Sequence, residues 1–252
     1  MLLGIDTSGA VSVAVARGEL AARSASCAGA APAQGDAESA HTGLDILAVR
    51  SDTRSRHHDE VLLALVEETL QAAGVTRGEL TGVVVGRGPG PFTGLRVGLV
   101  SARSIASVLG VPLHGLSSLD ALAHEALAAV PAERGPVTVG VALDARRREV
   151  YHARYRREVD GEILRIAEPA VDAPAEVATA LTACDLLVGS GTALYPELLP
   201  ATVELEHVDA GHLLLAASVL AVRGEDLTST EPMYLREPDA AKPTARKSAL
   251  GR

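Results

Sequence analysis

A strand-and-turn pattern occurs twice in this chain, and it constrains the fold more than any other feature of the sequence. Near the N-terminus an apolar run leads into the turn Asp6-Thr7-Ser8-Gly9, and valines alternate with small residues over 11–15. The pattern returns as an apolar run over 137–143, a turn that begins at Asp144, and an alternating segment over 149–155. Apolar strands joined by a short polar turn predict a hairpin. An internal duplication, in which Asp6 aligns with Asp144, is the most economical explanation of the two hairpins.

Strand and helix signals alternate between and after the two hairpins. Beyond the hairpins, the pattern predicts strands over 46–49, 83–85 and 186–188, and helices over 57–74, 93–109 and 212–222. The order strand, loop, helix over 83–109 predicts a layer of parallel α/β structure. The fold class that we expect is therefore α/β with two duplicated lobes.

The length of 252 residues is compatible with two lobes. We place a first lobe at 1–110, a second and smaller lobe at 111–235, and a mobile polar tail at 236–252. Residues 21–43 are rich in Ala, Gly and Ser without any period, which predicts a flexible insertion within the first lobe.

Composition excludes several classes of function. The net charge of -9 opposes tight, autonomous binding of a phosphate backbone, and four Tyr, one Phe and no Trp leave few side chains on which bases could stack. Cys27 and Cys184 do not form a C-x-x-C pair, so neither a disulfide framework nor a thiolate metal site is indicated. The start of the chain has no basic leader, and no apolar run approaches the roughly 18 residues of a membrane span. We expect a cytoplasmic protein with no membrane partner.

Two segments have the composition of a phosphate-binding site. Asp6, Thr7 and Ser8 combine a carboxylate with two hydroxyls in a hairpin turn, although the same tripeptide is ordinary turn sequence. The second segment, 86–94, follows a strand and opens a helix, and its candidates are Gly88, Gly90 and Thr93. It matches neither G-x-x-x-x-G-K-[ST] nor G-x-G-x-x-G, and its two prolines remove donors. A rigid structural connection therefore remains the alternative for this segment.

The helix over 57–74 is apolar on more sides than one buried stripe needs, because residues 61–66 are all apolar. Either both sides are covered within the monomer or one side contacts another protein. In the following helix Gly94, Gly98, Ala102 and Ala106 recur every four residues, a ridge that would let a second helix approach closely.

No set of residues has the spacing of a catalytic or metal site. The pair His57-His58 and the single His124 belong to no H-E-x-x-H or H-x-x-x-H motif, and no serine stands in a nucleophile motif. We therefore predict no catalytic residue and no metal ligand in this chain.

Five blocks, in order along the chain, resemble the bacterial TsaB (YeaZ) family. They are L-G-I-D-T-S at 3–8, H-x-E-x-L-L at 58–63, G-R-G-P-G-P-F-T-G-L-R-V-G at 86–98, L-D-A-R-R-R-E-V-Y at 143–151 and P-x-Y-L-R at 232–236. The resemblance implies an ASKHA (actin-like, sugar-kinase-like) fold of two duplicated lobes. It also implies a role in making threonylcarbamoyladenosine beside the anticodon of tRNA.

Members of that family are described as non-catalytic partners of a paralogous enzyme, TsaD, with an ATPase, TsaE, completing the complex. The paralogue carries H-x-x-x-H where this chain has Ser118 and Leu122, and neither side chain replaces an imidazole as a metal ligand. The resemblance thus implies a subunit without a cofactor of its own, with ATP or ADP and a metal held by the partner enzymes. It implies that tRNA is reached only through the complex, and that the isolated subunit can form a homodimer.

In the family, helices of the first lobe form the partner surface. Carried over to this chain, the expected contact residues are His58, Val61, Leu62, Leu65, Val66, Gly94, Gly98 and Ala102. Two alternative functions remain: an ATP-dependent ASKHA phosphotransferase that uses Asp6, Thr7 and the 86–94 segment, and an M22-type metallopeptidase, which the missing ligand pair disfavours.

Overall fold

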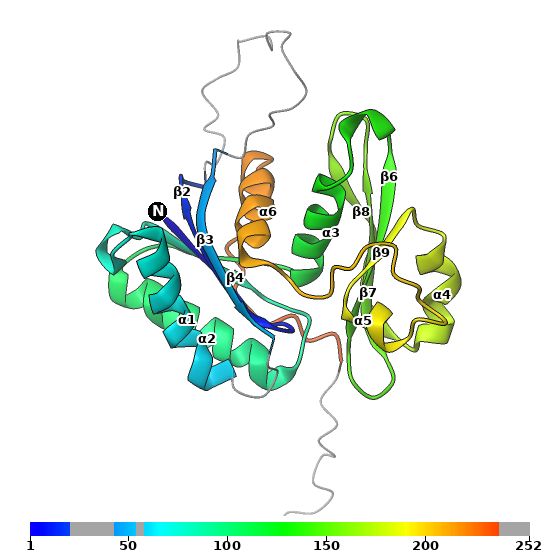
Figure 1. Cartoon of the computed structure of the whole chain (residues 1–252), viewed down its shortest axis with the longest axis horizontal. Helices are drawn as coiled ribbons and strands as arrows, with labels where there is room; N and C mark the ends of the chain where they lie inside the picture. Colours follow the sequence, from blue (N-terminus) through cyan, green and yellow to red (C-terminus); the bar gives the residue numbers. More distant parts are fainter. Residues whose placement is uncertain (21–42, 54–57, 237–252) are drawn as a thin grey trace, which may run out of the picture.

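The computed structural model describes residues 1–20, 43–53 and 58–236. Two sheets face each other across a pair of central helices (Figure 1). The predicted insertion at 21–43 and the predicted tail at 236–252 lie almost entirely outside the described residues.

The first sheet has the strand order β3-β2-β1-β4-β5. Its strands are β1 (Leu2–Asp6), β2 (Val11–Arg17), β3 (Asp45–Asp52), β4 (Gly82–Gly86) and β5 (Leu113–Leu116). β2 pairs antiparallel with β1 and β3, whereas β4 pairs parallel with β1 and β5. Helices α1 (His58–Ala73) and α2 (Phe92–Leu109) cover its outer face (Figure 1).

The second sheet repeats this arrangement with the order β8-β7-β6-β9. Its strands are β6 (Val137–Asp144), β7 (Val150–Arg157), β8 (Ile163–Asp172) and β9 (Leu186–Val188). β7 is antiparallel to β6 and β8, and β9 is parallel to β6. Helix α4 (Pro174–Thr182) packs on its outer side, and the short α5 (Ser190–Leu194) follows β9. The predicted duplication is confirmed, because Asp6 and Asp144 each end the first strand of a hairpin.

The two central helices cross over between the lobes. Helix α3 (Ser118–Ala128) follows the first sheet but packs against the second, and α6 (Ala210–Val222) follows the second sheet but packs against the first (Figure 1). The division at residue 110 that the sequence suggested is therefore wrong for two elements. β5 pairs with β4, and α6 covers the inner face of the first sheet. Which lobe β5 and α6 belong to depends on contacts between residues far apart in the sequence, and a local sequence pattern does not contain that information.

Side chains of the first sheet alternate between two cores. Leu3, Ile5 and Val13 pack with α1 and α2, whereas Leu2 and Ala14 pack in the central core that contains α3 and α6. Burial on both faces explains why these strands are almost continuously apolar. Two short 3₁₀ helices, η1 (Arg77–Glu79) and η2 (Ala132–Arg134), complete the described elements.

One described helix, α2, does reach the length and hydropathy of a membrane span, contrary to the expectation from the sequence. It has 18 residues and a mean hydropathy of 1.2, and 33% of it is buried in the protein. Its glycines and alanines are buried on the side that faces the first sheet, so one face of the helix is covered within the protein.

Candidate functional site

The hairpin turn after β1 is a closed polar cluster. Asp6 is buried, and its Oδ1 accepts hydrogen bonds from the Ser8 backbone N–H at 2.8 Å and the Ser8 hydroxyl at 2.6 Å. Its Oδ2 accepts from the Ser118 hydroxyl of α3 at 2.7 Å. Burial raises the pKa of the Asp6 carboxyl, while the hydrogen bonds from Ser8 and Ser118 act in the opposite direction.

The glycine-rich segment before α2 closes over this turn. A Cβ at Gly86 would lie 1.8 Å from Asp6 Oδ2, and one at Gly98 would lie 2.2 Å from Thr7 Oγ1. The Thr7 hydroxyl in turn donates to the Gly94 carbonyl at 2.8 Å. Glycine is required at 86 and 98 because no side-chain carbon fits between the hairpin turn and α2.

The six residues predicted to lie near a phosphate divide into two groups. Asp6, Thr7 and Ser8 are buried in the hairpin turn, and Gly90 packs on it, since a Cβ there would come 2.5 Å from the Ser8 carbonyl oxygen. Gly88 has a φ of +90°, its carbonyl accepts from the Ser118 N–H at 2.8 Å, and Thr93 is exposed at the start of α2. The polar groups of the hairpin turn thus bond within the protein. A phosphate role for these residues stays a prediction.

Ser118 and Leu122 occupy structural positions on α3. The Ser118 hydroxyl holds Asp6, and the Leu122 side chain is fully buried in the central core. Among the described residues, no group of three or more His, Cys, Asp or Glu side chains is placed to hold a metal ion.

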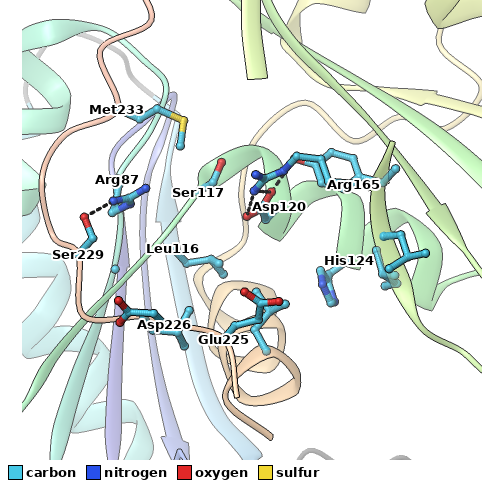
Figure 2. A pocket seen from close by; sticks show the side chains of 16 residues that line it. Arg87, Leu116, Ser117, Asp120, His124, Arg165, Glu225, Asp226, Ser229 and Met233 are labelled. Carbon is cyan, nitrogen blue, oxygen red and sulfur yellow. Dashed lines mark hydrogen bonds and ion pairs between the residues drawn. The ribbon is translucent and has the colours of Figure 1, made fainter. Parts of the chain in front are cut away.

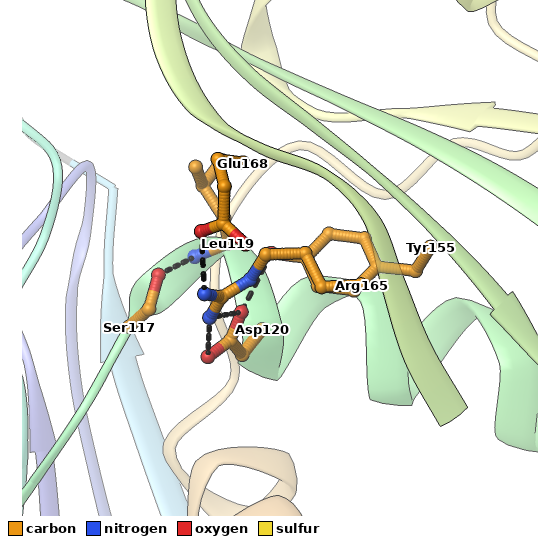
Figure 3. A network of polar contacts seen from close by, with 6 residues as sticks. All are labelled: Ser117, Leu119, Asp120, Tyr155, Arg165 and Glu168. Atoms are coloured by element: carbon orange, nitrogen blue, oxygen red, sulfur yellow. Dashed lines mark hydrogen bonds and ion pairs between the residues drawn. The ribbon is translucent and has the colours of Figure 1, made fainter. Parts of the chain in front are cut away.

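A second polar network connects α3 to the second sheet (Figure 3). Asp120 Oδ1 accepts from the Tyr155 hydroxyl at 2.6 Å, and one Arg165 terminal nitrogen contacts both Asp120 oxygens at 2.8 and 2.7 Å. Arg165 also bonds Glu168 at 3.0 Å. Burial raises the pKa of the Tyr155 hydroxyl well above its usual value, and the neighbouring Asp120 carboxylate adds to this shift. Sequence reasoning missed this network because its residues come from α3, β7 and β8.

The outer side of α1 and α2 carries an exposed apolar area, which we call the α1–α2 surface and define by Leu63, Val100 and Val108. These side chains are 60%, 63% and 84% exposed. Leu63 and Val108 lie on the two sides of a groove of about 310 Å³ between the helices, with the Glu67–Arg77 ion pair at its edge.

Most of the predicted contact residues face the first sheet, although Val66 also lines the groove of the α1–α2 surface. Leu62, Leu65 and Val66 are buried in the core with β1, β2 and β4, and the small-residue ridge of α2 is buried on the same sheet at Gly94, Gly98 and Ala102. A partner cannot reach Leu62, Leu65, Gly94, Gly98 and Ala102 in this structure, because they are buried inside the first lobe. Val61 is half-buried, and His58 is the first residue of α1.

Comparisons with known proteins agree with this architecture. Residues 49–242 match the family of TsaD, tRNA N6-adenosine threonylcarbamoyltransferase. An uncharacterized protein of Mycobacterium tuberculosis is 40% identical over 209 residues, which are 80% of this chain and 85% of that protein. Escherichia coli TsaB, a tRNA threonylcarbamoyladenosine biosynthesis protein, is 35% identical over 106 residues, 42% of this chain and 44% of that protein.

Among solved structures, YeaZ from Pseudomonas aeruginosa superposes with a TM-score of 0.66 at 29% identity, covering 93% of this chain and 99% of that chain. The likeness extends over both lobes. The ASKHA fold expected from the resemblance is confirmed.

Proposed function

Because this chain belongs to the TsaB (YeaZ) family, we propose that it is a non-catalytic partner subunit of a TsaD-type enzyme in tRNA threonylcarbamoyladenosine biosynthesis. In this role the chain binds and activates the enzyme that transfers the threonylcarbamoyl group, and it makes no bond itself. A TsaE-type ATPase completes the complex. ATP or ADP and the metal belong to these partner enzymes, and tRNA binds the complex in the cytoplasm.

The observation that supports a partner role most directly is the α1–α2 surface. Leu63, Val100 and Val108 are exposed on neighbouring helices of one lobe, and two of them border an apolar groove. Large exposed apolar areas on a folded protein mark contact sites. A second protein that inserts apolar side chains into this groove would bury them. The same surface accounts for a homodimer of the isolated subunit, since a second copy competes with TsaD for it.

The closed polar cluster at the hairpin turn after β1 supports a non-catalytic role. Asp6 accepts three hydrogen bonds from Ser8 and Ser118 and is 1% exposed, so a cation has little access to its carboxylate. At the positions where the resemblance places the imidazoles of the catalytic paralogue, Ser118 stabilises Asp6 and Leu122 fills the core.

Calorimetric titration against the TsaD-type paralogue tests the proposal. The informative variants are Leu63→Asp and Val108→Asp, which place a charge on the α1–α2 surface. Val159→Asp is the matched control, because Val159 is 79% exposed and lies on the turn between β7 and β8, away from both helices. We expect wild type and the control to bind alike, and each surface variant to bind at least about tenfold more weakly, which is 1.4 kcal/mol.

Unchanged thermal unfolding of both surface variants shows that they fold. Equal binding by Val108→Asp and wild type, or equal losses in Val108→Asp and Val159→Asp, would contradict the proposed surface. Absence of any binding by wild type would contradict the partner role.

A further inference from the structure

A pocket of about 310 Å³ lies between the lobes, separate from the α1–α2 surface, and Ser117 in its wall is next to Ser118 of the hairpin cluster (Figure 2). The loop after β4, the β5–α3 junction, β8 and the segment after α6 all contribute to its walls. The volume is at the lower end of the range for small-molecule sites in proteins.

The segment after α6, residues 225–236, closes one side of the pocket, and we call it the C-terminal strap. Its Leu227 carbonyl accepts from the Gly115 N–H at 2.8 Å, and its Met233 N–H donates to the Arg87 carbonyl at 2.8 Å. The Ser229 hydroxyl is also bonded to the Arg87 guanidinium. The strap is therefore attached to the first lobe at both ends of the pocket wall.

Arg87 provides a positive charge that no carboxylate of the described chain neutralises. Among the described residues, no Asp or Glu oxygen lies within ion-pair distance of it, and its Nε is buried without a hydrogen-bond partner. The other arginine of the pocket differs, because Arg165 is paired with Asp120 and Glu168. Because Nε is enclosed, the terminal nitrogens of the guanidinium are the donors that a bound carboxylate would meet.

The backbone around Arg87 is shaped to hold this side chain. A Cβ at Gly115 would lie 2.7 Å from Arg87 Cδ and 2.2 Å from the Ser229 carbonyl oxygen. Glycine at 115 thus allows the arginine to lie across β5 under the strap. Figure 2 shows the guanidinium beside Ser229 at one end of the pocket, with Asp120 and His124 farther along it.

The rest of the lining restricts the charge and size of a ligand. Leu116, Leu227 and Met233 supply apolar lining to the pocket, while Glu225 and Asp226 belong to the strap. Glu225 and Asp226 make the strap side negative, so only the end at Arg87 can take an anion, and a polyanion such as a nucleoside triphosphate is repelled by the two carboxylates.

We propose that this pocket binds a small organic acid whose single carboxylate pairs with Arg87 and whose short apolar chain packs against Leu116, Leu227 and Met233. A guanidinium and a carboxylate match in geometry as well as in charge. The site shares no residue with the α1–α2 surface, so it can be tested on the isolated full-length chain and does not depend on the proposed partner.

The test uses isovalerate as the probe and ligand-observed NMR titration as the readout. We expect saturable binding in the millimolar range, weakened at least tenfold in Arg87→Met. Arg103→Met is the matched control, because Arg103 contacts Thr230 and Glu231 of the same strap but does not line the pocket. It should bind isovalerate like wild type.

Three probes separate the chemistry. Isoamyl alcohol, which lacks the charge, should not saturate the protein, and inorganic phosphate should bind more weakly than isovalerate. Leucine tests whether the acidic neighbours accept an ammonium group as well, and its binding with the same dependence on Arg87 would place amino acids within the proposed class.

If Arg87→Met does not fold, the binding site can still be located from amide chemical shifts of the wild-type protein. Isovalerate should shift the amide resonances of Ser117, Leu227 and Ser229 in a ¹H–¹⁵N spectrum. Lack of saturable binding, shifts confined to residues elsewhere, equal binding by folded Arg87→Met, or tighter binding of phosphate would each overturn the proposal.

Discussion

Two adjacent leucines on α1 provide a sharp test of which face of this helix is the core. Leu62 is 0% exposed and packs with β1, β2 and β4, whereas Leu63 is 60% exposed on the α1–α2 surface. Truncating a buried leucine to alanine costs about 2–5 kcal/mol, while an exposed truncation stays within about 0.5 kcal/mol. For a chain of this size 1 kcal/mol corresponds to about 2–4 °C in Tm. Leu62→Ala should therefore lower Tm by roughly 4–20 °C, and Leu63→Ala by no more than about 2 °C.

Differential scanning calorimetry measures the stability effect, and titration with the TsaD-type paralogue measures the binding effect. The variant with the larger effect should differ between the two assays. Leu63→Ala should weaken binding without loss of stability, whereas folded Leu62→Ala should lose stability but bind like wild type. A larger loss of Tm in Leu63→Ala, or weaker binding confined to Leu62→Ala, would refute the assignment of the two faces.

Three other predictions concern the interior. Gly98→Ala should lower Tm because its Cβ would lie 2.2 Å from Thr7 Oγ1, at a cost of about 1–3 kcal/mol, whereas Gly78→Ala, with no atom within 4 Å of the new carbon, should not. Burial lowers the pKa of His124 from 6.5 to about 4. The unfolded chain therefore takes up this proton first, and the contribution of His124 to the free energy of unfolding should fall by roughly 3 kcal/mol as the pH drops from 6.5 to 4. His124→Gln should show a smaller loss in urea unfolding over this pH range, and an unchanged loss would contradict the assignment. Tyr155→Phe removes the 2.6 Å bond to Asp120 and should reduce the free energy of unfolding by about 1.5–3 kcal/mol, measured with urea at pH 7.

The sequence was informative wherever the signal was local. The two hairpins, the strand at Gly82–Gly86 and the helices α1 and α2 could be placed from apolar periodicity and glycine ends. Their duplication followed from the shared aspartate turns. The five sequence blocks also identified the family, since motifs in order along a chain are seldom shared by chance.

What could not be read from the sequence depends on contacts between distant residues. Residues 61–66 of α1 are all apolar, so periodicity could not show that Leu62 and Leu65 face the sheet while Leu63 does not. The small-residue ridge of α2 indicated close packing correctly, but the neighbour is the turn at Thr7 and the first sheet instead of a second protein. The Asp120 network and the pocket at Arg87 join elements from both halves of the chain, and no local pattern reports them.

Reconstituted tRNA modification is the most direct test of the partner role. The assay combines unmodified tRNA, threonylcarbamoyl-adenylate and the TsaD-type and TsaE-type proteins, and it measures threonylcarbamoyladenosine with this chain present, omitted, or replaced by the double variant Leu63→Asp/Val108→Asp. Modification should depend on the wild-type chain, be retained with Val159→Asp, and be lost with the double variant. Full modification without this chain, or with the double variant in its place, would contradict the account.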